Sequence, residues 1–474
     1  MIAVLLMALP LAGGLLAFAL PQGKAAKNLS WVVAGLVLAL AATLCLQPGT
    51  TQFQASWLPA LGAQFSLELN GLSKILVLLT ALAFPLVLGS TPNPSHQPGA
   101  YQALMLLTQA GLMGVFMASD ALLFYFCWEL ALIPVYFLCS IWGGEKRIAV
   151  TFKFFIYTFV GSLLLLVGIL YVYFQQAQPS FSWQAFHAVS LSAKEQAMVF
   201  WLFFLAFAIK MPIFPLHTWQ PDAYEQSPTG VTMILSGVMV KMGLYAVIRW
   251  LLPLFPEASH QFASLIAWTA VAGMLYASLI AIRQDDFKRL IAYSSIAHIG
   301  LMAAGLFVHQ AVALQGVVLQ LFAHGINVIG LWIMADRVER QLGTRQLSAL
   351  GGLAQKAPTM AIFLVVLSLA NIALPLTNAF VGEFLMFNGL FRYNMWMAAV
   401  GGISIILAAV YTLNMVQKII FGQTNALTES AQDLDAPQAL LLAILVAVIL
   451  LTGVYPQPLI QLTQDTVQTL FAQR

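Results

Sequence analysis

The sequence predicts an all-α integral membrane protein of about 14 transmembrane helices. Of its 474 residues, 61% are hydrophobic and only 8% are charged, and long apolar runs recur along the whole chain. Soluble domains carry about 25% charged residues, so a water-soluble fold could not cover this much apolar surface. Hydrocarbon must therefore surround most of the chain.

The predicted spans follow one another with mostly short connections. Each is a stretch of about 20 mostly apolar residues, the length that crosses a bilayer as a helix. Their ranges are 1–20, 29–47, 69–90, 101–119, 121–142, 152–174, 197–216, 227–250, 262–282, 288–308, 311–334, 358–390, 395–420 and 436–460. The first span lacks a basic leading segment, so we expect a retained helix and not a signal peptide. No shift in composition divides residues 1–474, which predicts one polytopic domain without a soluble catalytic module.

Lysine and arginine are distributed unevenly between the two sets of connections. Connections after odd-numbered spans hold Lys24, Lys27, Lys146, Arg147, Lys153, Arg283, Lys288, Arg289, Arg337, Arg340, Arg345, Lys356 and Lys418. Connections after even-numbered spans, with the tail, hold Lys194, Arg249, Arg392 and Arg474. Because cytoplasmic loops collect basic residues, this bias places the first set in the cytoplasm. Both termini are then outside, in the periplasm of a bacterial inner membrane, and the number of spans is even.

Prolines interrupt the seventh and the twelfth span. Pro212 and Pro215 follow the apolar part of the seventh, and Pro375 lies inside the twelfth. Proline removes a backbone hydrogen bond, which a membrane helix tolerates where it lines a polar cavity. The two breaks lie five spans apart, which predicts an inverted repeat of helices 4–8 and 9–13. Two ordinary proline kinks are the alternative.

The repeat divides the predicted domain into four parts. Three N-terminal helices occupy residues 1–100, and a C-terminal helix with the tail occupies residues 436–474. The first five-helix repeat covers residues 101–250 and the second covers residues 262–420. In transporters with inverted repeats, broken helices in corresponding positions indicate the transport site.

Few ionisable side chains remain inside the spans once the connections are set aside. They are Glu129, Lys210, Lys241, His298, His324 and Glu383, with Lys74 near the end of a span. A charge at the bilayer centre costs about 2.5–3.5 kcal/mol even on the lenient insertion scale. The six groups are therefore tolerable only where they face each other or water, and they predict a functional path.

The residue types favour the transport of protons. Burial lowers the pKa of lysine and raises that of glutamate, and histidine titrates near neutral pH without help. A row of such groups can take up and release protons at cellular pH. The alternatives are a static ion pair for Glu129 and Lys210, hydrogen-bonded core histidines for His298 and His324, and a snorkelling side chain for Lys241. Snorkelling is the expected behaviour of Lys74.

Other kinds of site have little support in the sequence. The three cysteines, Cys45, Cys127 and Cys139, lie in apolar runs without metal-binding spacing, so we expect no metal site. The net charge of +3 is too small to indicate nucleic acid. The remaining histidines lie at span ends or in loops, where we expect them to be solvated. They are His96, His187, His217, His260 and His309.

Four segments resemble the antiporter-like subunits of respiratory complex I. Residues 126–134 are similar to the family's fifth-helix motif, residues 208–223 to its seventh helix and loop, residues 235–245 to its eighth, and residues 288–300 to its tenth. Val381–Phe384 matches the context in which the M-type subunit carries glutamate, where L- and N-type subunits carry lysine.

This resemblance implies a proton-translocating subunit of an NADH–quinone oxidoreductase, enzymatic only as part of that complex. It implies that Glu129 with Lys210 switches the first half-channel, that Lys241, His298 and His324 continue the path, and that Glu383 ends the second half-channel. It also implies no cofactor on this chain, with NADH, FMN, iron–sulfur clusters and quinone on other subunits. The implied partners are the lipid bilayer and other membrane subunits, especially the L and N types.

The sequence departs from the family pattern in two places, and it leaves several alternative functions open. The acidic residue of the loop after the seventh helix is shifted by one position, to Glu225, and Leu376 and Ala379 replace glycines at the second break. The same fold could serve in a membrane hydrogenase, a formate hydrogenlyase or an Mrp-type sodium/proton antiporter. An independent solute transporter and a purely structural scaffold are alternatives from other classes.

The predicted topology is testable by cysteine labelling. A cysteine at Ser348 should escape a membrane-impermeant thiol reagent added from the periplasmic side, whereas one in the C-terminal tail should react, because basic loops stay in the cytoplasm. The reverse pattern would show that the number of helices or their orientation is wrong.

Overall fold

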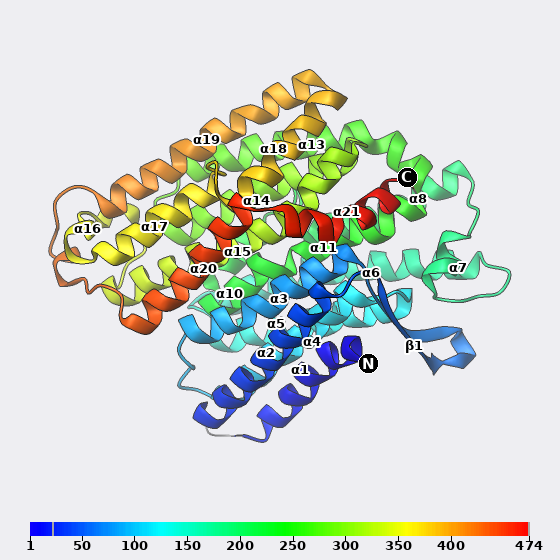
Figure 1. Cartoon of the computed structure of the whole chain (residues 1–474), viewed down its shortest axis with the longest axis horizontal. Coiled ribbons are helices and arrows are strands. Elements are labelled where there is room, and N and C mark those ends of the chain that lie inside the picture. The colour runs from blue at the N-terminus through cyan, green and yellow to red at the C-terminus, as the bar shows by residue number, and fades with distance from the viewer. Residues whose placement is uncertain (21–22, 473–474) are drawn as a thin grey trace.

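The apolar segments fold into a bundle of roughly parallel helices, shown as a computed structural model in Figure 1. The structure describes residues 1–20 and 23–472. Eleven helical stretches in this part of the chain are long and apolar enough to cross a membrane, and one of them is the irregular stretch of residues 229–254. Several other long helices of the bundle do not meet this criterion. The long helices are α1 (Ile2–Phe18), α2 (Gly23–Leu46), α3 (Gly71–Ser90), α4 (Pro98–Met117), α5 (Ala121–Trp142), α6 (Arg147–Phe174), α8 (Ala193–Lys210), α13 (Pro256–Ile282), α14 (Phe287–Phe307), α15 (Ala311–Leu342), α17 (Pro358–Asn371), α18 (Asn378–Tyr393), α19 (Met395–Ile420), α20 (Ala436–Val454) and α21 (Gln457–Ala472).

The predicted all-α membrane class is confirmed, and every predicted span contains helix. The count of 14 crossings stays a prediction. Several predicted ends are wrong, because helices continue into charged residues where these find partners. Thus α15 runs on to Leu342, through the ion pair of Asp336 with Arg340. The last span ends at Val454, before Pro456, and the predicted tail after it contains a further helix, α21.

One predicted span has an irregular helical backbone. Residues 229–254 comprise α10 (Thr229–Ile234), α11 (Lys241–Ala246) and α12 (Leu252–Leu254), joined by two π-helical segments, η2 (Leu235–Met239) and η3 (Val247–Leu251). We call this whole stretch the central helix. Every residue from 230 to 253 is buried, as is every residue of α15 from 316 to 336. π-Helical turns are rare and are frequent at functional sites.

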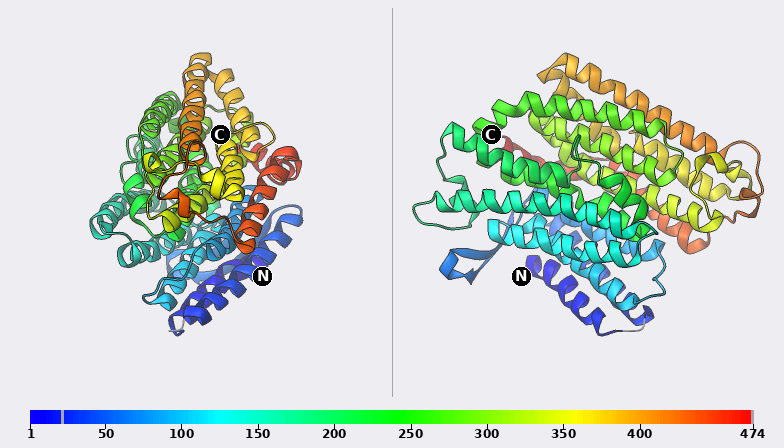
Figure 2. Two further views of the ribbon diagram at one scale, coloured as in Figure 1. Left: turned by 90° about the vertical axis from the view of Figure 1, so that its left-hand side faces the viewer. Right: turned by 180° about the vertical axis from the view of Figure 1, so that it is seen from behind.

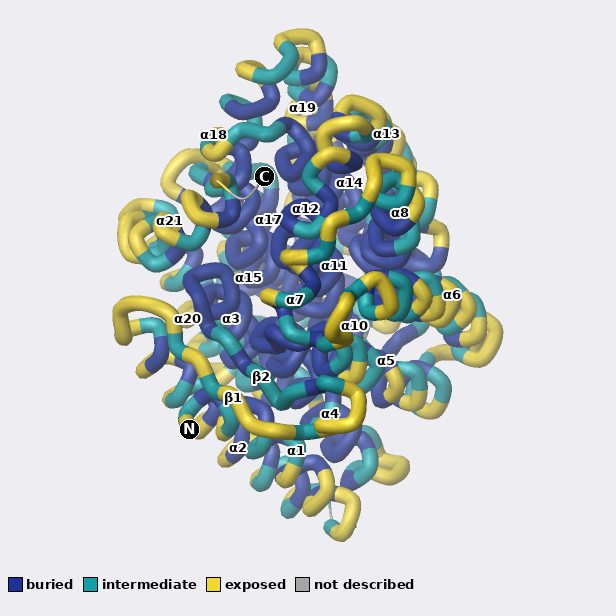
Figure 3. The backbone as a smooth tube through the Cα atoms, turned by 90° about the vertical axis from the view of Figure 1, so that its right-hand side faces the viewer, coloured by how far each residue is buried: buried dark blue, intermediate teal, exposed yellow. Residues whose placement is uncertain are grey.

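The buried elements lie in the middle of the bundle. Figure 3 shows buried backbone at α11, α14 and α15, and exposed residues on outer helices such as α6 and α19. Exposed apolar side chains are numerous on the outer helices, among them Phe152, Ile406 and Leu451. A protein surrounded by lipid is expected to carry such an apolar surface.

Both breaks appear as gaps between helices. The seventh span ends as α8 at Lys210, and the short α9 (Gln220–Gln226) begins after the prolines. The twelfth is divided between α17 and α18. Within the second gap, Ala373 and Leu376 have positive φ values of 55° and 77°. Leu376 thus occupies a left-handed conformation that suits glycine.

A β-hairpin between α2 and α3 was not predicted. Strands β1 (Thr51–Leu58) and β2 (Ala63–Leu69) pair antiparallel, and Thr51 lies opposite Leu69. Polar and apolar residues alternate in Phe65–Leu69, which is the period of a strand and could have identified it. The hairpin, the short α7 (Trp183–His187), the start of α1 and the end of α21 lie toward the same end of the bundle (Figures 1 and 2). An even number of crossings requires the termini to share one side.

The strained backbone at the second break gives a stability prediction. Replacing Leu376 by glycine should raise the thermal unfolding midpoint of the membrane-embedded protein, because a left-handed conformation costs a residue with a side chain about 1–2 kcal/mol. Leu374, in the same gap, has no positive φ and serves as the matched control. Leu374→Gly should lower the midpoint, and an equal loss in both variants would contradict the strain at Leu376.

Candidate functional site

Lys241 lies at the centre of the protein, in the short α-helical stretch between the two π segments. Its side chain is completely buried. The Lys241 Nζ donates to the backbone carbonyl oxygen of Ser236 at 2.6 Å and lies 2.8 Å from Nδ1 of His324. Ser236 belongs to the π segment η2, so the irregular backbone supplies one of the two partners of this amine.

The polar contacts continue from Lys241 to Glu383. The rings of His324 on α15 and His298 on α14 have centroids 5.6 Å apart. His298 Nδ1 lies 3.1 Å from Glu383 Oε1, which also accepts from Gln320 Nε2 at 3.2 Å. All five side chains are buried. The structure thus brings four of the six predicted residues into one line, which we call the polar line: Lys241, His324, His298 and Glu383.

Glycines let the helices that carry the polar line approach closely. A Cβ atom on Gly325 would lie 2.8 Å from the carbonyl oxygen of Gly237, so α15 meets the central helix backbone to backbone. Likewise, a Cβ on Gly316 would lie 2.7 Å from the carbonyl oxygen of Gly382. Gly325 directly follows His324 in the sequence, and Gly382 directly precedes Glu383. Small residues permit such close packing of membrane helices.

Glu129 and Lys210 do not form an ion pair. Between described residues, neither takes part in a salt bridge within 4.0 Å, and Lys210 Nζ and Glu129 Oε1 are both buried without a hydrogen-bond partner. Lys210 lies 5.5 Å from the ring centroid of Trp128 and still feels the charge of Glu129. A static buried ion pair, one reading of these residues, is therefore wrong.

The first break positions Lys210. It is the last residue of α8, and the chain turns there through a hydrogen bond from Ile213 N to the carbonyl oxygen of Ala208 at 3.2 Å. The indole of Trp219 donates to the carbonyl oxygen of Ile209 at 3.0 Å, which satisfies a backbone group next to the lysine. A Cβ on Gly243 would lie 2.7 Å from the carbonyl oxygen of Phe207. The broken helix therefore packs against the same α11 that carries Lys241.

The second break carries uncharged polar side chains that sequence reasoning missed. Asn371 Nδ2 donates to Ser294 Oγ at 3.0 Å, and the hydroxyl of Tyr411 donates to the same oxygen at 3.1 Å. Asn327 Nδ2 donates to the carbonyl oxygen of Ala370 at 3.1 Å. Ser294 lies one helical turn before His298. Polar residues within apolar runs are the signal by which the sequence indicates such a cluster.

A network of ion pairs ties the loop after the first break to α14. Glu225 pairs with Arg289 at 2.8 Å and with Arg345 at 2.5 Å, and Asp222 pairs with Lys153 at 2.9 Å and Arg289 at 3.1 Å. Partial burial raises the pKa of Asp222, but hydrogen bonds and charges of Lys153 and Arg289 outweigh it, so the pKa lies below its usual value. The sequence had suggested no role for Glu225.

Two expectations about residues near span ends are wrong. Lys74 does not snorkel, because its Nζ is held by the carbonyl oxygens of Gln47 and Gly49 at 2.6 and 2.7 Å, just after α2. His217 is not solvated, because the loop folds inward and buries the ring against Phe214 and Tyr276. Over residues 1–20 and 23–472, no group of three or more His, Cys, Asp or Glu side chains could hold a metal ion.

Several solved structures share this fold. A chain of respiratory complex I from Thermus thermophilus with bound NADH superposes with a TM-score of 0.93 and 32% sequence identity, covering 100% of this chain and 99% of that one. A chain of the Mrp complex from Dietzia sp. superposes with a TM-score of 0.88 at 21% identity, covering 99% and 97%. The second likeness concerns the fold alone.

Sequence comparisons give the family. A profile described as "NADH:quinone oxidoreductase/Mrp antiporter, TM" matches residues 118–409. The chain is 37% identical to NADH-quinone oxidoreductase subunit M of Pseudomonas aeruginosa, over 87% of this chain and 83% of the relative. It is 33% identical to the protein of that name in Escherichia coli K12, over 98% and 96%. The chain therefore belongs to the NADH:quinone oxidoreductase/Mrp antiporter family of multi-pass membrane subunits, with M subunits of NADH-quinone oxidoreductase among its relatives.

Proposed function

We propose that this chain is the M-type, proton-translocating subunit of an NADH–quinone oxidoreductase in a bacterial inner membrane. The observation that carries the proposal is the polar line from Lys241 through His324 and His298 to Glu383. The names of the relatives and the structural likeness to complex I support the choice of complex. Redox groups then belong to other subunits, and L- and N-type antiporter-like subunits are the proposed neighbours.

The two histidines relay protons by exchanging them between their ring nitrogens. Lys241 passes a proton to Nδ1 of His324, and a histidine can release one from its other nitrogen. Nε2 of His324 and Nε2 of His298 are both buried without a hydrogen-bond partner within the described residues. We expect water to connect these two atoms, because each is a buried polar atom that needs a hydrogen-bond partner. His298 Nδ1 then delivers a proton to Glu383 Oε1, which faces it directly.

Lys210 and Glu129 act as the switch that drives this relay. Lys210 is held near Trp128 by a cation–π contact and by the field of Glu129, without a hydrogen bond to fix its amine. A buried charge that is not locked can move by a few ångströms, and in a low dielectric such a movement changes the proton affinity of its neighbours. The packing of the first break against α11 links this movement to Lys241.

The family also includes Mrp-type antiporters, and membrane hydrogenases and formate hydrogenlyases remain alternatives with the same kind of proton path. These alternatives differ from the proposed function in the complex to which the chain would belong, and not in the residues that would carry the protons. Neighbouring genes for other NADH-dehydrogenase subunits would favour the proposed complex, and genes for a hydrogenase or an Mrp operon would contradict it.

The switch predicts the effect of neutralising Glu129. Glu129→Gln should lower coupled NADH oxidation by roughly 10²-fold, the lower end of what a positioned proton-transfer group contributes, while the complex still assembles. Lys210→Ala should do the same, and Glu129→Asp should fall between, because it keeps the charge but shortens its reach. Proton pumping by assembled complexes in sealed vesicles is the measurement. Normal pumping in Glu129→Gln would rule out the switch.

The end of the polar line gives a second functional prediction. Glu383→Ala should block proton translocation, because it removes the group that receives the proton from His298. Glu383→Lys should retain part of it, because lysine serves at this position in sibling subunits and can also titrate when desolvated. The number of protons translocated per NADH in reconstituted complexes decides the matter. A wild-type ratio in Glu383→Ala would remove Glu383 from the path.

A further inference from the structure

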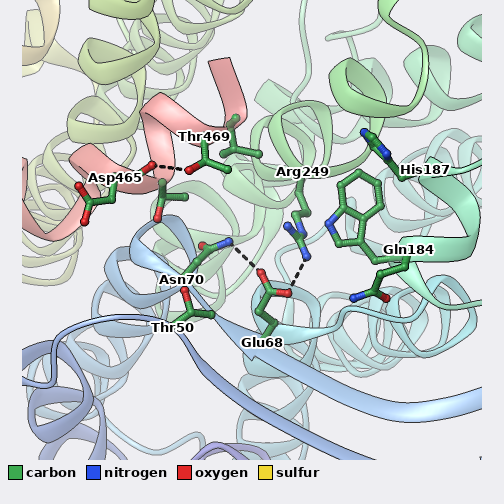
Figure 4. A pocket seen from close by; sticks show the side chains of 11 residues that line it. Thr50, Glu68, Asn70, Gln184, His187, Arg249, Asp465 and Thr469 are labelled. Atoms are coloured by element: carbon green, nitrogen blue, oxygen red, sulfur yellow. Dashed lines mark hydrogen bonds and ion pairs between the residues drawn. The ribbon is translucent and has the colours of Figure 1, made fainter. Parts of the chain in front are cut away.

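A polar pocket of about 470 Å³ opens at the end of the bundle that carries α7, α21 and the hairpin. Figure 4 shows side chains from these separate elements converging on it. Exposed side chains form its rim: Thr50, Gln184, His187 and Thr469. Its floor includes the buried side chains of Asn70 and Arg249. The pocket therefore leads from the surface into the interior.

An ion pair occupies the floor of the pocket. Arg249 lies 3.1 Å from Glu68, and its guanidinium lies 4.9 Å from the ring centroid of Trp183. Glu68 also accepts from Asn70 Nδ2 at 3.3 Å. The Arg249 side chain is only 7% exposed and that of Glu68 only 15%. Removing such an ion pair from water costs desolvation free energy, so the pair is weak evidence for a stabilising role and a functional role is worth testing.

The floor of the pocket lies on the same helix as Lys241. Tyr245 follows Lys241 by four residues and Arg249 follows Tyr245 by four, so each step spans about 6 Å along a helix axis. Tyr245 is buried, and its hydroxyl lies beside the side chain of Ser73. It also feels the charges of both Arg249 and Glu68. Tyr245 therefore lies between Lys241 and Arg249 along the helix, and its hydroxyl and that of Ser73 form what we call the hydroxyl pair.

We propose that this pocket is a proton outlet for Lys241, in addition to the route through Glu383, and that Tyr245, Ser73 and the Arg249–Glu68 pair form its inner end. The proposal rests on the proposed function of Lys241. The Lys241 ammonium gives one proton to the hydroxyl pair and becomes a neutral amine. The hydroxyl pair gives up one of its own protons to the Glu68 carboxylate. Glu68 releases it to the water of the pocket, so one proton leaves the lysine and one enters the solution.

The Arg249 charge gives the outlet its direction. The cation beside Glu68 favours the ionised carboxylate, so a proton that arrives there is passed on to water. It also opposes the return of a cation from the pocket toward Lys241. A purely structural ion pair, which joins β2 to the central helix, would need neither the open pocket nor the hydroxyl pair behind it.

Blocking the pocket from outside tests the outlet. Thr469→Cys places a thiol on the rim, and Gln468→Cys is the matched control, because both positions are exposed on α21 but only Thr469 lines the pocket. Both are made in a chain with Cys45→Ser, since Cys127 and Cys139 are buried. Spheroplasts are treated with a quaternary-ammonium methanethiosulfonate, and NADH-driven proton translocation is then measured in inverted membrane vesicles.

The expected result is at least about a twofold loss of proton translocation in modified Thr469→Cys, reversed by dithiothreitol, with modified Gln468→Cys unchanged. Equal translocation in the two modified variants would overturn the outlet, as would inhibition only when the reagent is added from the cytoplasmic side. Lys241→Ala, measured in parallel, separates this proposal from the one on which it rests. Loss of pumping in Lys241→Ala without an effect at Thr469 refutes the outlet alone. Normal pumping in Lys241→Ala refutes the role of the lysine itself.

Discussion

The hydrogen bond between Lys241 and His324 joins the two most deeply buried helical stretches, and the rest of the site depends on it. A titratable group in hydrocarbon must find its partners inside the protein. Here the amine is satisfied by one backbone carbonyl, that of Ser236 in a π segment, and by one imidazole. From that contact the polar line extends to His298 and Glu383. On the other side of Lys241, the central helix continues through Tyr245 to Arg249 at the floor of the pocket.

Close helix packing is what makes such contacts possible. Gly325 against Gly237, and Gly316 against Gly382, bring backbones together so that side chains from different helices can touch. The same packing presses the break after Lys210 against α11. A movement of the Lys210 side chain would thus act on Lys241 through electrostatics and through a shared interface, which is the combination that a coupled transporter needs.

Much of this arrangement could be predicted from the sequence, for physical reasons. Apolar runs specify helices because lipid leaves the backbone no other choice, and six charged or titratable residues stand out because each is costly there. Contacts between helices are set by tertiary packing, which one sequence does not reveal. The sequence alone therefore does not show that Lys241 contacts His324 whereas Lys210 does not contact Glu129. The π segments depend on neighbours distant in the chain, so the sequence does not predict them. The hairpin and the polar side chains around Ser294 do leave a signal in the sequence, in the alternation of Phe65–Leu69 and in the polar residues within apolar runs.

The most direct test of the account is the proton stoichiometry of complexes that carry His324→Gln. Glutamine can still accept a hydrogen bond from Lys241, but it cannot take up and release a proton. His217→Gln is the control, because His217 is buried but lies off the polar line. The account predicts that His324→Gln loses proton translocation per NADH oxidised while His217→Gln keeps it. A wild-type ratio in assembled His324→Gln complexes would contradict the relay through the polar line.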